Sequence, residues 1–267
     1  MKAEDLKQVV QEKYGAIANQ SVLLSQQSCC GTSGCCGDDG IIMIGDEYTK
    51  VAGHNPDADL GLGCGIPTEF AGIKPGDSVL DLGSGAGNDC FVARSIVGEN
   101  GKITGIDFTP EMIQKANENL AKTGFKNIVF VLGDIENMPL PENTFDVVIS
   151  NCVLTLVPDK QKAFSEIYRV LKPGGHFCIS DVVLIGELPE KVKQTAALYA
   201  GCVSGAEQKQ NYLGIIAKTG FKNIQIHKEN LINVPDSVLL KFISVEELKE
   251  IKSKKTGIFS ITISAEK

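Results

Sequence analysis

The chain has 267 residues, of which 43% are hydrophobic, a share that suffices for a substantial packed core. Its 26 basic and 33 acidic residues leave a formal net charge of −7, which argues against nucleic acid or an anionic membrane as the main partner, because both attract basic surfaces. The sequence holds no apolar run long enough to span a bilayer, and residues 1–20 mix acids and lysines with apolar residues, unlike a signal peptide. We therefore expect no membrane partner and a cytoplasmic location.

The amino-terminal part, residues 1–70, is predicted to be a helix followed by a cysteine-rich arm. Apolar residues recur near helical spacing over about residues 2–20, which predicts an amphipathic helix. The stretch QQSCCGTSGCCGDDG follows at residues 26–40, and sequence rich in Gly, Asp and Pro continues to about residue 70. This part is expected to form an extension in front of the main domain.

The four cysteines of the arm, Cys29, Cys30, Cys35 and Cys36, lie among Gly, Ser and Thr, too polar a setting for core packing. A disulfide staple is a minor interpretation, because the expected compartment is reducing and the nine cysteines of the chain are odd in number. A zinc site remains open, although adjacent cysteine pairs fit a tetrahedron poorly. The favoured interpretation is a thiol arm that collects a soft ligand or relays disulfide exchange.

The pattern of predicted elements changes at GDSVLDLGSGAGNDC, where short β-rich runs begin to alternate with helical segments. This alternation predicts a mainly parallel sheet with helices on both faces over residues 71–185. Residues 186–267 are predicted to add the substrate-side helices and the closing strands of the same sheet. Two late strands, at 223–230 and in GIFSITISAEK, are expected to close the sheet as an edge hairpin.

One heptapeptide, KTGFKNI, occurs at residues 122–128 and again at 218–224. A duplicated module is one interpretation, but the flanking sequences do not match. We interpret each copy as a helix end capped by Gly124 or Gly220 and leading into a strand.

The strongest motif is VLDLGSGAGNDC, in which Asp81 is predicted to end the first strand and Gly83, Gly85 and Gly87 to form the turn into a helix. Glycines are needed where backbone passes close to a ligand or adopts positive φ. Such a loop lies at the carboxyl end of a strand, where ligands bind in doubly wound sheets. A dinucleotide dehydrogenase would show a similar turn, so the loop alone leaves the ligand open.

Two further acids narrow the choice of ligand. Asp107 is predicted to end the second strand, the place for a carboxylate that accepts both ribose hydroxyls. Asp134 is predicted to end the third strand, where it could bind the amino group of an adenine while Ile135 packs on the ring. The alternative for each acid is a solvent-facing strand end or a helix N-cap.

Four motifs in order, LDLGSGAG, GID, GDIENMPLPENTFDVVISN and RVLKPGGHF, resemble the S-adenosylmethionine-dependent class I methyltransferase superfamily over roughly residues 70–185. The resemblance implies an α/β fold with a Rossmann-like seven-stranded sheet and helices on both faces. It also implies the residues that hold S-adenosylmethionine, the last of them near the methyl group: Asp81, Gly83, Ser84, Gly85, Gly87, Asp107, Asp134, Ile135 and Asn151.

The methyl acceptor is not given by the fold. Oxygen and nitrogen acceptors usually require a general base, and the histidines are His54, His176 and His227. His176 and His227 fall in predicted strands and are interpreted as surface or structural residues, whereas His54 has no partner visible in the sequence. A general base is therefore poorly supported.

Cysteines, by contrast, are abundant where an acceptor would bind. Cys64 lies in GLGCGIP, Cys152 follows the predicted fourth strand in SNCVLTLV, and Cys202 lies in LYAGCVSGA. These three can converge above the cofactor, where three thiolates would suit a thiophilic ion. The alternative for each is a small residue at a tight spot. Cys90 and Cys178 are assigned to packing.

A narrower resemblance is carried by DLGLGCGIP, DLGSGAGNDC, SNCVLTLV and YAGCVSGA, which look like the arsenite methyltransferases. It implies that Cys64, Cys152 and Cys202 bind trivalent arsenic, as arsenite or methylarsenite. A further cysteine would act in redox steps, and spacing favours Cys35 or Cys36. The resemblance implies thioredoxin or glutathione as the reductant, and no structural metal is expected. Thiolate-bound arsenic keeps a lone pair, so its methylation needs no base.

Two other hypotheses remain open. A class I methyltransferase for a small organic acceptor, such as a quinone-type ring, would use the same cofactor site and leave the cysteines incidental. A thiol-rich metalloid-binding protein would lack cofactor binding, against which the intact set of Asp81, Asp107 and Asp134 argues.

Overall fold

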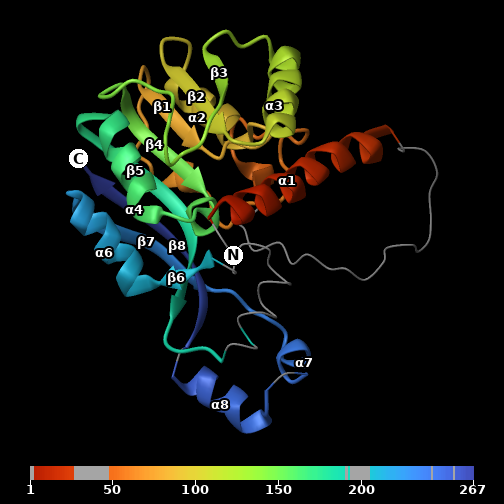
Figure 1. Cartoon of the computed structure of the whole chain (residues 1–267). Helices are drawn as coiled ribbons and strands as arrows, with labels where there is room; N and C mark the ends of the chain where they lie inside the picture. Colours follow the sequence, from red (N-terminus) through yellow and green to blue (C-terminus); the bar gives the residue numbers. More distant parts are fainter. Residues whose placement is uncertain (1–2, 27–47, 190–191, 193–204, 242, 255) are drawn as a thin grey trace.

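The computed structural model describes residues 3–26, 48–189, 192, 205–241, 243–254 and 256–267 (Figure 1). Its centre is a sheet whose main path runs in the order β3-β2-β1-β4-β5-β8-β7, with the short β6 pairing beside β5. The strands are β1 Ser78–Leu82, β2 Lys102–Asp107, β3 Ile128–Leu132, β4 Phe145–Asn151, β5 Leu171–Ile185, β6 Glu207–Gln208, β7 Lys222–Leu231 and β8 Gly257–Glu266. The predicted α/β class and the seven-stranded path are confirmed.

Strands β1 to β5 pair in parallel, and β8 runs antiparallel to both β5 and β7. The two late strands predicted from the sequence are therefore present at one side of the sheet. They are not joined by a tight turn, because 25 residues with two helices connect them.

Helices cover both faces of the sheet, as expected. The described helices are α1 Ala3–Gln26, α2 Asn88–Val97, α3 Pro110–Thr123, α4 Lys160–Val170, α6 Lys209–Thr219, α7 Asp236–Leu239 and α8 Val245–Ser253. Alternate residues of one strand separate the two layers: Leu80 packs with α4 and α6, whereas Val79 packs with α2 and α3. This alternation is the period-two pattern of a sheet buried on both sides.

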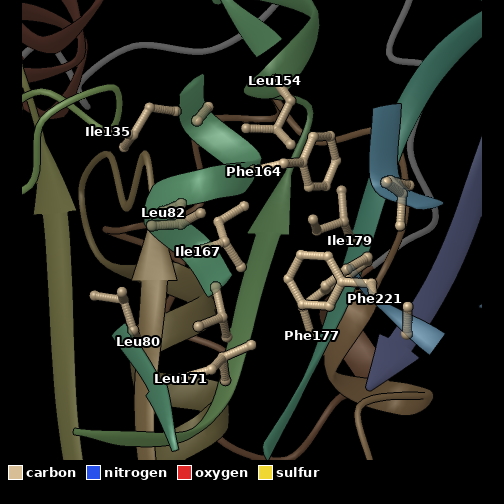
Figure 2. Packing of buried hydrophobic residues seen from close by; sticks show 14 of the residues in the cluster. Leu80, Leu82, Ile135, Leu154, Phe164, Ile167, Leu171, Phe177, Ile179 and Phe221 are labelled. Atoms are coloured by element: carbon tan, nitrogen blue, oxygen red, sulfur yellow. The ribbon is translucent and has the colours of Figure 1, made fainter. Parts of the chain in front are cut away.

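Helix α4 shows how an apolar stripe and a capping residue place a helix against one face of the sheet. Its apolar side chains Ala163, Phe164, Ile167 and Val170 are buried along one stripe. Asp159 caps the helix by accepting a hydrogen bond from the Lys162 backbone nitrogen at 2.9 Å. The stripe faces the sheet in the core cluster of Figure 2.

The ring of Phe164 is the centre of this cluster. It contacts the rings of Phe177, Tyr212 and Phe221 at centroid distances of 5.6–6.5 Å. Figure 2 shows Phe164 and Phe177 side by side above the strands. Because aromatic pairs add to the gain from burial, this group joins α4, β5 and α6 into one body.

The repeated heptapeptide marks the two edges of the sheet. Gly124 follows α3 and Gly220 follows α6, each in the left-handed conformation of a C-cap. The first copy leads into β3 and the second into β7, which are the outermost strands of the main path. The interpretation as two helix-to-strand turns is confirmed.

Three expectations about element ends need correction. Strand β1 ends at Leu82, one residue after Asp81. Strand β3 ends at Leu132, so Asp134 lies in the turn beyond it and forms an isolated β-bridge with Asn137. Helix α1 continues to Gln26, further than the expected end near residue 20.

The segment between β7 and β8 carries α7 and α8 and extends beyond the end of the sheet (Figure 1). Its buried residues Val234, Ile243 and Leu248 belong to an apolar cluster that also contains Cys64 and Cys152. Among the described helices, none is both long and apolar enough to cross a membrane.

Candidate active site

A pocket opens at the carboxyl ends of β1, β2 and β4. The glycine-rich loop forms one wall, and helix α1, which crosses this end of the sheet in Figure 1, contributes another. The predicted residues that line it are Asp81, Gly83, Ser84, Gly85, Asp107, Asp134, Ile135, Asn151 and Cys152. Gly87 does not line the pocket, because it is the N-cap of α2, with the Phe130 ring behind it.

The glycine-rich loop is shaped for close approach. Gly83 has a φ of +62°, and a Cβ at that position would lie 2.4 Å from the Val153 side chain. The neighbouring Ser84 hydroxyl is buried and has no hydrogen-bond partner within the described residues. A buried hydroxyl without a partner costs free energy, so a polar ligand in the pocket would stabilise the loop.

Asp107 is a buried carboxylate held by backbone donors. The nitrogen of Gly85 donates to its Oδ2 at 3.0 Å, and the nitrogen of Thr109 donates to its Oδ1 at 2.8 Å. Burial nevertheless raises the pKa of Asp107, and these hydrogen bonds oppose that rise. Each oxygen keeps a second lone pair, which suits a carboxylate that accepts ligand hydroxyls.

Helix α1 reaches the rim of the pocket. Lys7 forms an ion pair with Asp134 at 2.6 Å and also contacts the Glu136 carboxylate. The side-chain amide of Gln11 donates to the Phe108 carbonyl at 2.9 Å. The Asp134 side chain is thus held by a lysine 127 positions away, a contact that no sequence pattern predicts.

Two acids, Asp81 and Asp89, line the same pocket. Cys90 donates its thiol hydrogen to Asp81 at 3.2 Å, and burial raises the pKa of both groups well above their usual values. Cys90 is therefore buried as predicted, but it also has a polar contact beyond packing. Asp89 lines the same pocket, and burial raises its pKa to about 6.

Cys64 and Cys152 belong to one buried cluster, and Cys152 also lines the pocket. Both are buried, at 4% exposure, in the same apolar cluster, although they come from a loop before β1 and from the residue after β4. Burial chiefly raises the pKa of Tyr212, and the Cys64 and Cys152 thiols each contribute to that rise. Both sulfur atoms therefore lie within electrostatic reach of one phenol.

The backbone turns sharply at Cys152. Its φ is +61°, a conformation that costs a non-glycine residue about 1 kcal/mol or more. The Cys152 nitrogen donates to the Ser180 carbonyl at 2.8 Å, which holds the turn at the end of β4. Strained residues of this kind cluster at functional sites, and this one carries a thiol that lines the pocket.

The remaining predicted thiols have different outcomes. Cys202 and the arm residues Cys29, Cys30, Cys35 and Cys36 lie outside the described residues. Cys178 is fully buried in β5, and burial raises the pKa of its thiol to about 12, as suits the packing role assigned to it.

Each histidine has a structural contact. His54, for which no partner was visible in the sequence, pairs with Asp59 at 3.0 Å and stacks on Tyr48. The ring nitrogen of His176 hydrogen-bonds to the Ala71 carbonyl. His227 stacks on Phe70 and contacts the Ser264 hydroxyl at 2.7 Å. These contacts agree with the structural interpretation of His176 and His227.

Asn151 is the hub of a polar network that sequence reasoning missed. Its amide nitrogen donates to the Tyr48 hydroxyl and to the Gly65 carbonyl, each at 2.8 Å, and lies 3.2 Å from Asp89 Oδ2. The Tyr48 hydroxyl donates to Asp89 Oδ1 at 2.7 Å. Tyr48 lies in no recognised motif. Asp89 lies within VLDLGSGAGNDC but was given no role there, so only the fold reveals that the two side chains meet.

Comparisons with known proteins agree with this arrangement. Residues 73–220 match a family model described as a methyltransferase domain. An arsenite methyltransferase of Halobacterium salinarum is 43% identical over 84% of this chain and 59% of its own length. The human arsenite methyltransferase is 32% identical over 95% of this chain and 69% of its own length.

A solved structure is also similar. The crystal structure of an arsenic(III) S-adenosylmethionine methyltransferase from Chlamydomonas reinhardtii aligns with a TM-score of 0.64 and 35% identity. The alignment covers 77% of this chain and 67% of that one. The chain thus spans about three fifths to two thirds of the length of these relatives.

Proposed function

The chain belongs to the arsenite methyltransferase family, and from that premise we propose that it transfers a methyl group from S-adenosylmethionine to trivalent arsenic held by cysteine thiolates. The observation that carries the proposal is that Cys64 and Cys152 belong to one buried cluster and that Cys152 lines the pocket. Two buried thiols from distant parts of the chain beside a glycine-rich cofactor loop suit a soft acceptor. The biological role we propose is detoxification of arsenic.

The pocket residues fit S-adenosylmethionine, which supplies an electrophilic methyl group on a sulfonium. Asp107 would accept the ribose hydroxyls, and the unpaired hydroxyl of Ser84 offers a further polar contact. Ile135 would pack on the adenine, and Asp134 would bind its amino group in competition with Lys7. Asp89, whose pKa is raised to about 6, is ionised at neutral pH and adds negative charge to a pocket that would hold a cationic ligand.

Arsenic would be bound by exchange of its hydroxyl groups for thiolates. Each As–O bond of arsenous acid breaks as an As–S bond forms, and the thiol hydrogen leaves with the hydroxyl as water. Cys64 and Cys152 would supply two sulfurs, and Cys202 is proposed as the third. Thiolates are the ligands that a soft thiophilic ion prefers.

Methyl transfer then requires alignment more than acid–base chemistry. The arsenic lone pair attacks the methyl carbon, the carbon–sulfonium bond breaks, and its electron pair stays on sulfur as S-adenosylhomocysteine departs. No proton is removed, which suits a site whose described histidines are engaged elsewhere. Orientation of this kind is worth about 7–11 kcal/mol in favourable intramolecular reactions.

Transfer leaves arsenic formally pentavalent, so a two-electron reduction must follow. Two cysteine thiolates would form a disulfide and return the electron pair to arsenic. Cys35 or Cys36 is proposed to take part, and thioredoxin or glutathione would then reduce the disulfide. We place the reaction in the cytoplasm, where such reductants keep thiols reduced.

The test is a methylation assay on the reduced full chain with arsenite, S-adenosylmethionine and a thiol reductant, followed by separation of arsenic species with elemental detection. Wild type should give methylated arsenic, and Cys152→Ala should lose at least 100-fold in rate. Cys178→Ala is the matched control, because it removes a buried thiol that does not line the pocket and should keep activity. Absence of methylated arsenic despite cofactor binding would overturn the proposal in favour of an organic acceptor.

A further inference from the structure

The loop that carries Cys64 is held to the end of β4 by the side chain of Asn151. Asn151 Oδ1 accepts from the Cys64 backbone nitrogen at 2.9 Å, and Asn151 Nδ2 donates to the Gly65 carbonyl at 2.8 Å. One side-chain amide therefore hydrogen-bonds to the backbone nitrogen of Cys64 and to the backbone carbonyl of the next residue. Cys152 is the next residue along the chain, so the same side chain relates the two cysteines.

Neighbouring side chains leave no space for a Cβ atom at Gly63 or at Gly65, the residues on either side of Cys64. A Cβ at Gly63 would lie 2.6 Å from Asn151 Nδ2, and a Cβ at Gly65 would lie 2.6 Å from the Ser180 hydroxyl. Glycine on both sides of Cys64 is therefore required for this approach. The loop is built to sit at one distance from β4 rather than to move freely over the pocket.

The orientation of the Asn151 amide is itself fixed by two other side chains. The Tyr48 hydroxyl accepts from Asn151 Nδ2 and donates to Asp89 Oδ1, and Asp89 Oδ2 lies 3.2 Å from the same nitrogen. With only acceptors on that side, the amide nitrogen must face Tyr48 and Asp89. The amide oxygen must then face the Cys64 nitrogen.

We propose that Tyr48 and Asp89 are positioning residues for the acceptor site: by orienting the Asn151 amide, they set the Cys64 loop so that both thiols reach one arsenic atom. This inference rests on the proposed function and adds two residues to it. Neither side chain needs to touch arsenic. Their effect is on the distance between two sulfurs, and proximity sets how tightly a bidentate thiol pair holds one ion.

Two substitutions isolate this role with little change in volume. Tyr48→Phe removes the hydroxyl between Asp89 and Asn151, and Asp89→Asn removes the charged acceptor while keeping the shape. Tyr168→Phe is the matched control, because Tyr168 packs on Phe221, away from the pocket. A thermal melt of each variant checks that the fold is kept.

The direct measurement is thiol pairing by phenylarsine oxide, a trivalent arsenical that bridges two close thiols. The protein carries serine at Cys29, Cys30, Cys35 and Cys36, so the arm does not compete. After proteolysis, mass spectrometry measures the yield of the Cys64 and Cys152 peptides joined through one arsenic. We expect a reduction of at least fivefold in Tyr48→Phe and Asp89→Asn, and wild-type yield in Tyr168→Phe.

A kinetic split provides the second readout. Tyr48→Phe, which removes no charge from the pocket, should raise the apparent KM for arsenite at least tenfold while the KM for S-adenosylmethionine stays within threefold. Equal loss for both substrates, or wild-type peptide joining in both variants, would overturn the positioning role.

The two proposals fail in different ways. If phenylarsine oxide joins the Cys64 and Cys152 peptides of the wild-type protein but the protein never methylates arsenic, the proposed function is wrong and the positioning role stands. If wild-type protein methylates arsenic but the peptides are not joined, the positioning role falls.

Discussion

The side-chain oxygen of Asn151 accepts a hydrogen bond from the backbone nitrogen of Cys64 across 2.9 Å, although the two residues are 87 positions apart in the chain. This bond joins the segment before the sheet to its central strand at the point where both thiols lie. The acceptor site is therefore assembled by long-range polar contacts as well as by the thiols themselves.

Replacing Asn151 with aspartate tests how much the fold depends on this contact. Asn151→Asp keeps the shape but turns the donor nitrogen into an oxygen facing the Gly65 carbonyl and Asp89. We expect a loss of about 3 kcal/mol in the free energy of unfolding, because buried acceptors then oppose one another. Urea denaturation measures it. Asn117→Asp on the exposed face of α3 is the control, and equal losses in the two variants would contradict the account.

Helix α1 provides a prediction about local opening. Lys7→Met should remove the pairing with Asp134 and Glu136 and weaken the docking of α1 by up to about 1 kcal/mol. Hydrogen exchange of the α1 amides should then be up to about fivefold faster, with no change in β4. Lys13→Met, on the exposed side of the same helix, should leave the exchange rates unchanged. Equal rates in wild type and Lys7→Met would contradict the role assigned to the pair.

The aromatic group around Phe164 predicts the cost of a core cavity. Phe164→Ala should lower the free energy of unfolding by about 3–5 kcal/mol, because the ring is fully buried against three others. Equilibrium urea denaturation measures the loss. Val129→Ala on β3, where the side chain is 57% exposed, should cost less than about 0.5 kcal/mol. A small loss in Phe164→Ala would mean that α4 is not part of the cooperative core.

Asp181 predicts a dependence of stability on pH. This carboxylate accepts from the Tyr212 hydroxyl and the Val182 nitrogen, and burial raises its pKa to about 6 from 3.8. Between these values the folded chain binds more protons at this group than the unfolded chain, so its contribution to stability falls as pH rises. The change from pH 5 to pH 7.5 is about 1.4 kcal/mol.

The measurement compares Asp181→Asn with wild type at these two pH values, so that other titrating groups cancel. The stability of the variant relative to wild type should improve by about 1.4 kcal/mol on going to pH 7.5. Glu118→Gln, on the exposed face of α3, is the control and should show no such trend. A constant difference in Asp181→Asn at both pH values would contradict the assignment.

Sequence pattern predicted the parts of the molecule that depend on local chemistry. The glycine-rich loop and Asp107 were found because a loop before a helix and an acid at a strand end have recognisable spacing. Cys64 and Cys152 were singled out from their places in the expected order of strands, and the structure puts both in one buried cluster. Such features need only the fold class and the residue types.

Contacts between distant side chains could not be predicted in the same way. Tyr48 meets Asp89 across 41 positions and Asn151 across 103, and no periodicity encodes those pairs. Amphipathicity predicted helix α1 but not which surface it covers, so the ion pair of Lys7 with Asp134 was missed. No partner for His54 was visible in the sequence, because Asp59 becomes one only through the turn between them.

The most direct test of the central claim is a single turnover with S-adenosylmethionine that carries a deuterated methyl group. Arsenite-loaded protein is mixed with this donor, quenched and digested, and the cysteine peptides are analysed by mass spectrometry. The account predicts arsenic that bears the deuterated methyl group and is still bound to the Cys152 peptide, in wild type and in Cys178→Ala. Arsenic that stays unmethylated at Cys152 while S-adenosylhomocysteine forms would contradict it.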